Sequence, residues 1–355
     1  MAYIGLERQA QLLAAGAVSS AALVDAALAR IEATQGTLNA FRRIRADAAR
    51  GEAAEADRRL AEGQRAPLLG VPVAIKDDMD LAGEPTAFGC AGDFPIRTSD
   101  SEAVRRLRLA GAVIVGKTNT PEFGQYPFTE GAAFGVTRSP WDLDHTPGGS
   151  SGGSAVAVSA GVVAAALGSD GAGSVRIPAA WSNLVGIKPQ RGRISSWPDP
   201  EAFNGLTSNG PLARTVADAA YLLDVVTGNH PGDRHQPAPP GSSCRQAADR
   251  EPGRLRIALS LRAPFCLAAV HLDPEVRTAV ERLASVLEGL GHQVVTADPA
   301  YRLMGLSFLS RSMPALREWG QRVPDLTALD HRTQENCRSG RLFSPFLSVA
   351  RSSER

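Results

Sequence analysis

The sequence predicts an α/β fold whose central sheet is covered by helices on both faces. The segment that ends near Lys76 and the segment 112–118 are short, apolar and rich in β-branched residues, as buried strands are. Helical patterns lie between and around them. Strands that are apolar at successive positions are typical of a sheet with no solvent-facing side, so helices are expected on both faces.

The first third of the chain begins with two expected helices. Ser19 and Ser20 stand at an N-cap position, and apolar residues then recur at helical spacing over 23–31. A second, charged helix is expected over 47–62, where an Ala-rich face can pack on the first helix. A β-branched run bounded by Gly and Pro follows, and it predicts a buried strand that ends near Lys76.

The middle of the chain continues the alternation of helices and strands. A helix is expected over 101–110, a buried strand over 112–118 and a helix over 216–226. The apolar run 155–167 lies between two Gly/Ser clusters and is interpreted as a buried helix. This run is well short of the roughly 18–20 residues that span a bilayer, so no membrane segment is expected.

The last third is predicted to hold a smaller α/β segment and then helices. Residues 230–254, rich in Pro, Gly, Ser and Arg, are expected to form a loop. A strand over 256–261, a helix that begins at Asp273–Pro274 and a strand over 292–297 follow. Residues 302–355 have a polar helical pattern without a strand signal.

Composition and charge argue against several classes of function. The formal net charge of +1 gives no electrostatic case for binding nucleic acid or an anionic membrane. The four cysteines form no CxxC pair, and no His, Cys and Asp spacing indicates a metal site, so neither a metal nor another cofactor is expected. The N-terminus lacks the basic start and apolar core of a signal peptide. We therefore expect a cytoplasmic protein that acts on a small molecule, with a homodimer left open.

Two overlapping GxSxG motifs centre on Ser150 and Ser151. This motif is typical of the nucleophile elbow of α/β-hydrolases, which needs a strand that runs directly into the serine. The preceding segment, RSPWDLDHTP, contains two prolines and is not a strand, which argues against an elbow. His145 lies close to both serines in the sequence, and we expect it to be a flanking loop residue rather than a catalytic base.

Four longer motifs stand out in the sequence: VPVAIKDDMD (71–80), TPGGSSGGSAVAVSAG (146–161), GSDGAGSVRIPAA (168–180) and VGIKPQRGRIS (185–195). Together they give the chain a clear resemblance to the amidase signature family. The motifs are long and occur in the order of the family, and the resemblance is strongest from about 18 to 226. It implies a single domain over 1–355, with core motifs at 66–226 and a smaller α/β extension at 255–355. It also implies a mixed central sheet, incomplete at its C-terminal side.

The resemblance implies a site built from two serines and a lysine. Carried over to this sequence, Ser174 is the nucleophile, Ser150 is a relay serine beside a cis peptide, and Lys76 is the base. The spacing that the family keeps between its relay serine and its nucleophile is also kept here. No metal ion or organic cofactor is implied.

The loop around the expected nucleophile is predicted to stabilise a negatively charged oxygen. Small residues leave backbone N–H groups unobstructed, so four amides are expected to form an oxyanion hole: Gly171, Ala172, Gly173 and Ser174. Four further residues are expected to support the site. Ser151 is a hydrogen-bond partner in the loop, Ser154 supports Lys76 or the loop, and Asp170 and Arg176 form an ion pair that shapes the loop.

The proposed chemistry requires a neutral lysine. A serine hydroxyl attacks well only when a base removes its proton, and a lysine is such a base only in its neutral form. At pH 7 the lysine is neutral in half of the molecules only if its pKa falls from about 10.4 to about 7. Burial can lower a lysine pKa by about 3 to 5, and Lys76 lies at the end of an apolar strand. Asp77 and Asp78 would oppose this change, but strand alternation turns Asp77 to the opposite face.

Three functions are compatible with these residues. The first is an amidase that cleaves small amides through an acyl-enzyme on Ser174. The second is the glutaminase subunit of a tRNA-dependent amidotransferase, although members of that type usually carry Gln where this chain has Ile177. The third is an incomplete or inactive member, because relatives usually continue beyond the point where this sequence stops. Four residues are candidates for the apolar walls of an acyl pocket: Phe88, Phe123, Tyr126 and Trp181.

Overall fold

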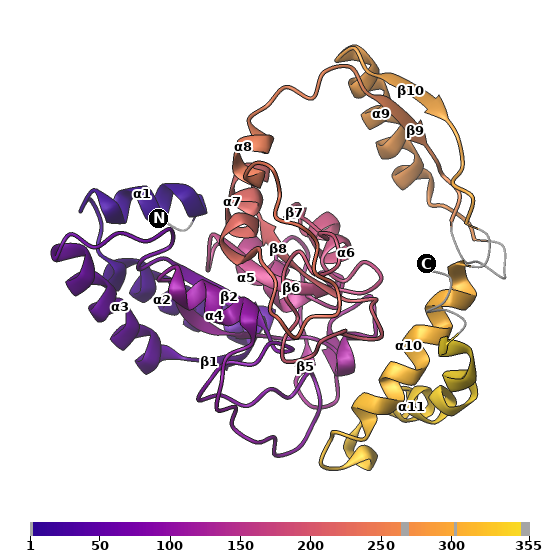
Figure 1. Ribbon diagram of the computed structural model, residues 1–355, viewed down its shortest axis with the longest axis horizontal. Coiled ribbons are helices and arrows are strands. Elements are labelled where there is room, and N and C mark those ends of the chain that lie inside the picture. The colour runs from indigo at the N-terminus through magenta and orange to yellow at the C-terminus, as the bar shows by residue number, and fades with distance from the viewer. Residues whose placement is uncertain (1–2, 264–269, 302–303, 349–355) are drawn as a thin grey trace.

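The computed structural model describes residues 3–263, 270–301 and 304–348, and a mixed β-sheet lies at its centre (Figure 1). The sheet has six strands in the order β1–β3–β2–β6–β8–β7. The three central strands β3, β2 and β6 are parallel, whereas β1, β8 and β7 run antiparallel to the strands beside them. The strands are β1 (Phe41–Ile44), β2 (Pro72–Lys76), β3 (Val113–Thr118), β6 (Ala165–Asp170), β7 (Val185–Gly186) and β8 (Ser208–Ala213).

The described chain also contains α-helices and two small two-stranded sheets. The α-helices are α1 (Leu6–Ala14), α2 (Ser20–Leu38), α3 (Ala46–Ala61), α4 (Glu102–Leu109), α5 (Gly152–Ser159), α6 (Arg176–Trp181), α7 (Val216–Val226), α8 (Cys244–Ala248), α9 (Pro274–Gly289), α10 (Met304–Gly320) and α11 (His331–Phe343). Strands β4 (Glu130–Gly131) and β5 (Gly135–Val136) pair with each other, as do β9 (Arg256–Leu259) and β10 (Gln293–Thr296). Short 3-10 helices cover Glu122–Gly124, Leu326–Ala328 and Ser344–Phe346.

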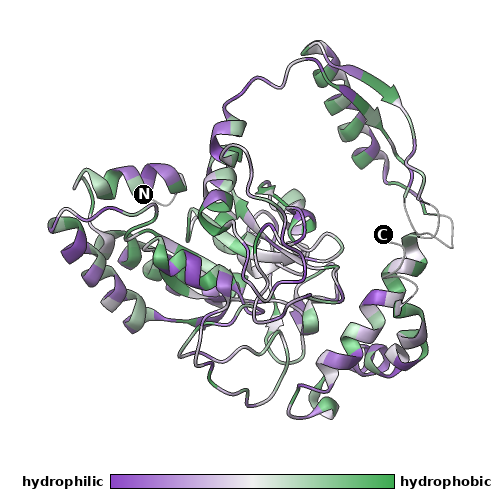
Figure 2. Ribbon diagram, viewed as in Figure 1, coloured by the Kyte–Doolittle hydropathy of each residue, from purple (hydrophilic) through white to green (hydrophobic). Residues whose placement is uncertain are grey.

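The two faces of the sheet pack against different helices, because successive side chains of a strand point in opposite directions. Val73 and Ile75 of β2 belong to a core that includes α1, α4 and α7. Ala74, between them, belongs to a second core that includes α2, α3 and α5. Figure 2 shows this arrangement as apolar strands in the centre and outer helices with mixed apolar and polar residues. The predicted sheet with helices on both faces is therefore confirmed.

Several predicted element boundaries agree with the structure. Helix α2 follows the N-cap residue Ser19, whose Oγ accepts a hydrogen bond from the amide of Ala22 at 3.1 Å. Helix α7 occupies the predicted residues 216–226, and strand β2 ends at Lys76. The predicted strand, helix and strand after residue 255 correspond to β9, α9 and β10.

The interpretation of 155–167 as one buried helix is wrong. Helix α5 ends at Ser159, and strand β6 already begins at Ala165. Gly161 has a φ of 72°, a left-handed conformation that commonly ends a helix and that glycine adopts without strain. Both halves of the run are buried, so its continuous apolar character reflects two different elements rather than one.

Helix α5 lies so close to neighbouring backbone that Gly153 leaves no room for a side chain. A Cβ at this position would lie 2.5 Å from the carbonyl oxygen of Ala40 and 2.7 Å from that of Asn119. We expect Gly153→Ala to lower the free energy of unfolding by about 2 kcal/mol, because backbone atoms cannot move aside cheaply. Gly51→Ala, in the open middle of α3, is the control and should stabilise by up to about 1 kcal/mol. Urea denaturation of both variants measures the difference, and equal effects would contradict the packing argument.

The C-terminal part of the described chain forms a β9–α9–β10 unit and then a pair of packed helices (Figure 1). Strands β9 and β10 form a separate parallel sheet, and no described residue after 301 forms a strand, as expected. Residues 302–303 and 349–355, also expected to be helical, lie outside the described residues. Helices α10 and α11 pack together, and their Leu316 and Cys337 join Phe88 and Phe123 in an apolar cluster. None of the described helices is long and apolar enough to cross a membrane.

Candidate active site

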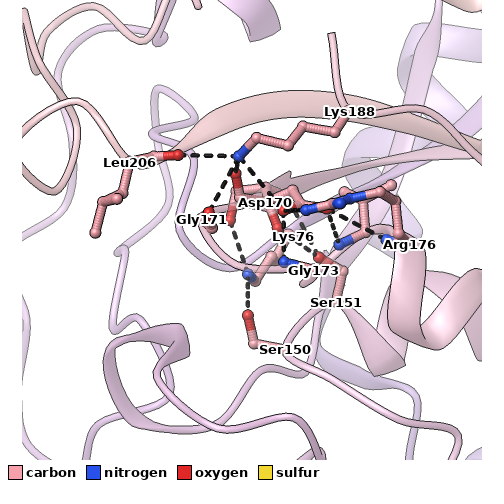
Figure 3. A network of polar contacts seen from close by, with 11 residues as sticks. Lys76, Ser150, Ser151, Asp170, Gly171, Gly173, Arg176, Lys188 and Leu206 are labelled. Carbon is pink, nitrogen blue, oxygen red and sulfur yellow. Dashed lines mark hydrogen bonds and ion pairs between the residues drawn. The ribbon is translucent and has the colours of Figure 1, made fainter. Parts of the chain in front are cut away.

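Lys76 occupies the last position of β2, and its side chain is only 1% exposed. Its Nζ donates hydrogen bonds to Ser150 Oγ and to Ser169 Oγ, each at 2.8 Å. The carboxylate of Asp78 lies 3.3 Å from the same nitrogen. Figure 3 shows the lysine reaching from the sheet to Ser150. The end of strand β2 thus places the Lys76 amine between the hydroxyl groups of Ser150 and Ser169.

Burial lowers the pKa of Lys76, although the charge and hydrogen bond of Asp78 and the charge of Asp170 oppose this effect. The net direction is the one that a general base requires. Asp77 points away from the lysine, as strand alternation predicted. Its carboxylate instead forms ion pairs with Lys117 at 2.8 Å and Arg42 at 3.2 Å.

Ser150 is fully buried and follows a cis peptide bond from Gly149, as the sequence resemblance implied. The neighbouring Ser151 donates from its Oγ to the carbonyl of Ser169 at 3.2 Å and accepts from the amide of Ser169 at 3.3 Å. The backbone N–H of Ser151 donates to the carbonyl of Ser174 at 3.0 Å. Ser151 therefore connects the two Gly/Ser clusters through hydrogen bonds, in the loop role predicted for it.

Ser154 makes no hydrogen bond to Lys76. Its Oγ donates to the carbonyl of Leu167 at 3.0 Å and shares a hydrogen bond with Thr118 Oγ1 at 2.7 Å. These bonds tie α5 to β6 and β3. Ser154 Oγ thus bonds to two strands beside the site, and neither to Lys76 nor to the loop, which were the two partners expected for it.

Ser174 and Ser150 line the same cavity, which has a volume of about 210 Å³. Ser174 is half-buried, and its hydroxyl forms no hydrogen bond among the described residues. The two hydroxyls are not hydrogen-bonded to each other in this structure. Catalytic hydrogen bonds are often long or unformed until substrate binds. The hydroxyl of Ser174 is thus available to a molecule in the cavity, beside the serine that contacts Lys76.

Asp170 organises the loop that carries Ser174. Its carboxylate accepts from the amides of Gly173 at 2.7 Å and Val175 at 3.2 Å, and from two nitrogens of Arg176 at 2.9 Å each. Burial alone would raise the pKa of Asp170, but the Arg176 hydrogen bonds, the Lys188 charge and the Gly173 amide hold it well below its ordinary range. The expected Asp170–Arg176 ion pair is present, and it shapes the loop from inside (Figure 3).

The expected set of four oxyanion donors needs a correction. The amide of Gly173 already donates to Asp170, so it points into the loop rather than toward the cavity. No hydrogen bond among the described residues uses the amides of Gly171, Ala172 or Ser174. These three residues also line the cavity, and their N–H groups remain as candidates.

Comparisons with known proteins identify the family. A family model described as Amidase matches residues 22–323. The chain belongs to the amidase family. AmiA2 of Mycobacterium tuberculosis, a protein assigned to the amidases, is 56% identical over 344 residues, which are 97% of this chain and 70% of AmiA2. Among solved structures, 6-aminohexanoate cyclic dimer hydrolase is similar, with a TM-score of 0.86 and 32% sequence identity. A bacterial aryl acylamidase of the amidase signature family is also similar, with a TM-score of 0.86 and 25% sequence identity. Each structural match covers 98% of this chain and 74% of the other.

These matches confirm the family, the fold class and the class of enzyme that the sequence predicted. The protein is a hydrolase that acts on amides, and its mixed sheet is that of the amidase signature enzymes.

Sequence reasoning missed two polar residues of this amidase site. Ser169 Oγ accepts from Lys76 and itself donates to Asp78, so it links the lysine to that carboxylate. Lys188 Nζ donates to the backbone carbonyls of Asp170, Gly171 and Leu206, the last at 2.9 Å (Figure 3). Both residues lie inside the family motifs quoted above. The motifs therefore carried a signal for them, although no local pattern predicted their contacts.

Three of the four expected wall residues line the cavity of this amidase, namely Phe88, Phe123 and Tyr126. Trp181 does not, because it lies at the end of α6 with 56% of its surface exposed, one helical turn beyond Ile177, which does line the cavity. His145 is also outside the site. Its exposed side chain contacts Asp142 at 3.0 Å, which agrees with a flanking loop residue.

Proposed function

We propose that the protein hydrolyses a small carboxylic amide to the acid and the amine or ammonia through an acyl-enzyme on Ser174. The observation that carries this proposal is the 2.8 Å hydrogen bond from a buried Lys76 to Ser150, at the edge of the cavity that Ser174 lines. A serine next to a buried amine has a route for losing its proton, and a second serine in the same cavity has an accessible hydroxyl for the attack.

The proposed reaction begins with two proton transfers. Neutral Lys76 accepts a proton from Ser150, which accepts one from Ser174 as the Ser174 oxygen bonds to the amide carbon. The amides of Gly171, Ala172 and Ser174 then stabilise the negative charge on the carbonyl oxygen. When the carbon–nitrogen bond breaks, Ser150 gives its proton to the leaving nitrogen and regains one from Lys76, which becomes neutral again.

Water completes the cycle by attacking the acyl group on Ser174, with its proton taken along the same route. The acid leaves, and Ser174 regains its hydrogen. Lys76, Ser150 and Ser174 carry out the proton transfers in this scheme, which includes no metal ion or organic cofactor. We further propose that the protein acts in the cytoplasm, without a nucleic-acid or membrane partner.

Acyl-enzyme trapping tests the proposal. Hexanoyl p-nitroanilide, a simple amide, is mixed with the protein and quenched with acid, and peptide masses are then measured. We expect the mass of a hexanoyl group on the peptide that contains Ser174, and no acylation or release of p-nitroaniline in Ser174→Ala. Ser151→Ala is the matched control and should keep measurable turnover, because the Ser151 hydroxyl bonds only to backbone atoms of Ser169 among the described residues.

Acylation of Ser150 or Ser151 in place of Ser174 would overturn the assignment of the nucleophile. A folded protein that neither turns over nor becomes acylated by any simple amide would instead support the inactive-member alternative.

A further inference from the structure

The loop that carries Ser174 is held by two charged groups of opposite sign. The Asp170 carboxylate accepts hydrogen bonds from backbone amides of the loop. The side chain of Lys188 instead donates to backbone carbonyls, those of Asp170, Gly171 and Leu206 (Figure 3). None of the proposed proton transfers uses Lys188, so its position beside the nucleophile loop needs another explanation.

The contacts of Lys188 favour its charged form. Its Nζ lies 3.2 Å from the carbonyl oxygen of Gly171, 2.9 Å from that of Leu206 and 3.4 Å from the carboxylate of Asp170. Burial lowers the pKa of Lys188, and the charge of Asp170 opposes that effect. Three carbonyls use all three N–H donors of an ammonium, which a neutral amine does not have. Lys76 differs, because it contacts two hydroxyls that can themselves donate to a neutral amine.

Two of the carbonyls that Lys188 binds belong to peptide units with candidate oxyanion donors. The carbonyl of Asp170 shares its unit with the amide of Gly171, and the carbonyl of Gly171 shares its unit with the amide of Ala172. Both peptide bonds are trans, so in each unit the N–H points away from the carbonyl. Both amides therefore point away from Lys188. Gly171 and Ala172 line the cavity, and their amides make no hydrogen bond with a described residue.

We propose that Lys188 is a positioning residue of the oxyanion hole. Its ammonium holds the carbonyls of Asp170 and Gly171, so that the amides of Gly171 and Ala172 face the cavity. A cation bonded to a carbonyl also polarises the peptide unit, which makes its N–H a stronger donor. Donors that are held in place beforehand cost no reorganisation when the oxyanion forms. This inference rests on the proposed function, because the oxyanion forms only if Ser174 attacks the amide carbonyl.

The separate effects on kcat and KM for hexanoyl p-nitroanilide test this role. Lys188→Met should lower kcat about a hundredfold and change KM less than about threefold, because the oxyanion exists in the transition state and not in the bound substrate. Lys188→Arg keeps a positive charge and several donors, so its kcat should be at least about tenfold above that of Lys188→Met. If Lys188→Met does not fold, Lys188→Gln replaces it. Its amide has two donors and no charge, and kcat should fall at least about tenfold.

Arg214 provides a matched control away from the cavity. It is also a partly buried cation that donates to three backbone carbonyls, those of Ile4, Val158 and Val163. None of these described residues lines the cavity. Arg214→Met should therefore lower stability but leave kcat per folded molecule within about twofold of normal. Circular dichroism and urea denaturation give the folded fraction of this variant and of Lys188→Met.

Two ketones with the same pentyl chain separate oxyanion stabilisation from binding. Pentyl trifluoromethyl ketone accepts the Ser174 oxygen at its carbonyl carbon, and its carbonyl oxygen becomes an anion as the serine proton passes through Ser150 to Lys76. Methyl pentyl ketone has a similar shape but is too weak an electrophile to form a stable anion. In Lys188→Met the inhibition constant should rise about a hundredfold for the fluorinated ketone and less than about threefold for the other.

Two results would overturn the inference and leave the proposed function in place, provided that Ser174 is acylated in the unsubstituted protein. One is an unchanged kcat in Lys188→Met. The other is an equal loss of kcat per folded molecule in Lys188→Met and Arg214→Met, which would reduce Lys188 to a general role in stability. Absence of acylation at Ser174 would instead contradict the proposed function, and this inference with it.

Discussion

Lys76→Met is expected to lower kcat/KM for a neutral amide at pH 7 by about a thousandfold. Loss of a positioned general base typically costs on the order of a hundredfold to ten-thousandfold. Methionine has a similar length and is apolar, so it suits a position that is 1% exposed. The substitution removes the group that takes the proton from Ser150 and leaves Ser174 and the cavity in place. Steady-state release of p-nitroaniline measures the loss.

The fold of Lys76→Met should remain close to that of the unsubstituted protein. Asp78 loses the lysine as its ion-pair partner but keeps the hydrogen bond from Ser169. Circular dichroism and urea denaturation check this expectation. Turnover within a few fold of normal by Lys76→Met at pH 7 would refute the assignment of Lys76 as the base.

The pH dependence of the reaction follows from the same lysine. Below its pKa, Lys76 holds a proton and cannot accept another, so activity should rise with pH and level off once Lys76 is neutral. Because burial lowers the pKa of Lys76 and Asp78 opposes that effect, Asp78→Asn should lower the pKa further. The rise in kcat/KM should therefore move to lower pH in Asp78→Asn, and it should disappear in Lys76→Met. A rise at the same pH in the protein and in Asp78→Asn would show that another group controls it.

Features that depend on local order could be predicted from the sequence. Successive side chains along β2 point to opposite faces of the sheet, so Lys76 and Asp77 are expected to have different partners. Lys76 does contact Ser150, whereas Asp77 contacts Lys117. The cap at Ser19 and the helix 216–226 are local in the same sense. The family motifs supplied the rest of the site, because their order and spacing bring together residues that no local pattern connects.

Features that depend on tertiary contacts could not be predicted. Ala and Val in 155–167 are compatible with either a buried helix or a buried strand, and packing divides the run at Gly161. The Gly173 amide donates to the Asp170 carboxylate rather than facing the cavity, and this depends on the side-chain conformation of Asp170. Lys188 lies within a family motif, but only the folded chain brings its amine to the carbonyls of Asp170 and Gly171.

Lys117→Met is expected to lower the free energy of unfolding by about 3 kcal/mol or more. Lys117 is as deeply buried as Lys76 but faces a different environment. Its Nζ lies 2.8 Å from the carboxylate of Asp77 and donates to the carbonyl of Pro85 and to Thr86 Oγ1, both at 2.8 Å. Removing it leaves a carboxylate that is 1% exposed with only Arg42 as a counter-charge, and it leaves two acceptors unpaired. Removal of one partner from a buried ion pair typically costs about 3–5 kcal/mol.

The double variant Asp77→Asn/Lys117→Met separates loss of the pair from loss of packing. The asparagine side chain carries no charge, so the double variant leaves no buried carboxylate without its lysine and should recover more than half of the lost stability. Urea denaturation of the two single variants and the double variant measures the coupling between the residues. A loss below about 1 kcal/mol in Lys117→Met, or no recovery in the double variant, would contradict a structural role for the pair. Two equally buried lysines on neighbouring strands should thus respond oppositely to the same substitution. Lys76→Met removes activity with little loss of stability, because Asp78 keeps its hydrogen bond from Ser169. Lys117→Met removes stability, because Lys117 binds a carboxylate that is 1% exposed and two further acceptors.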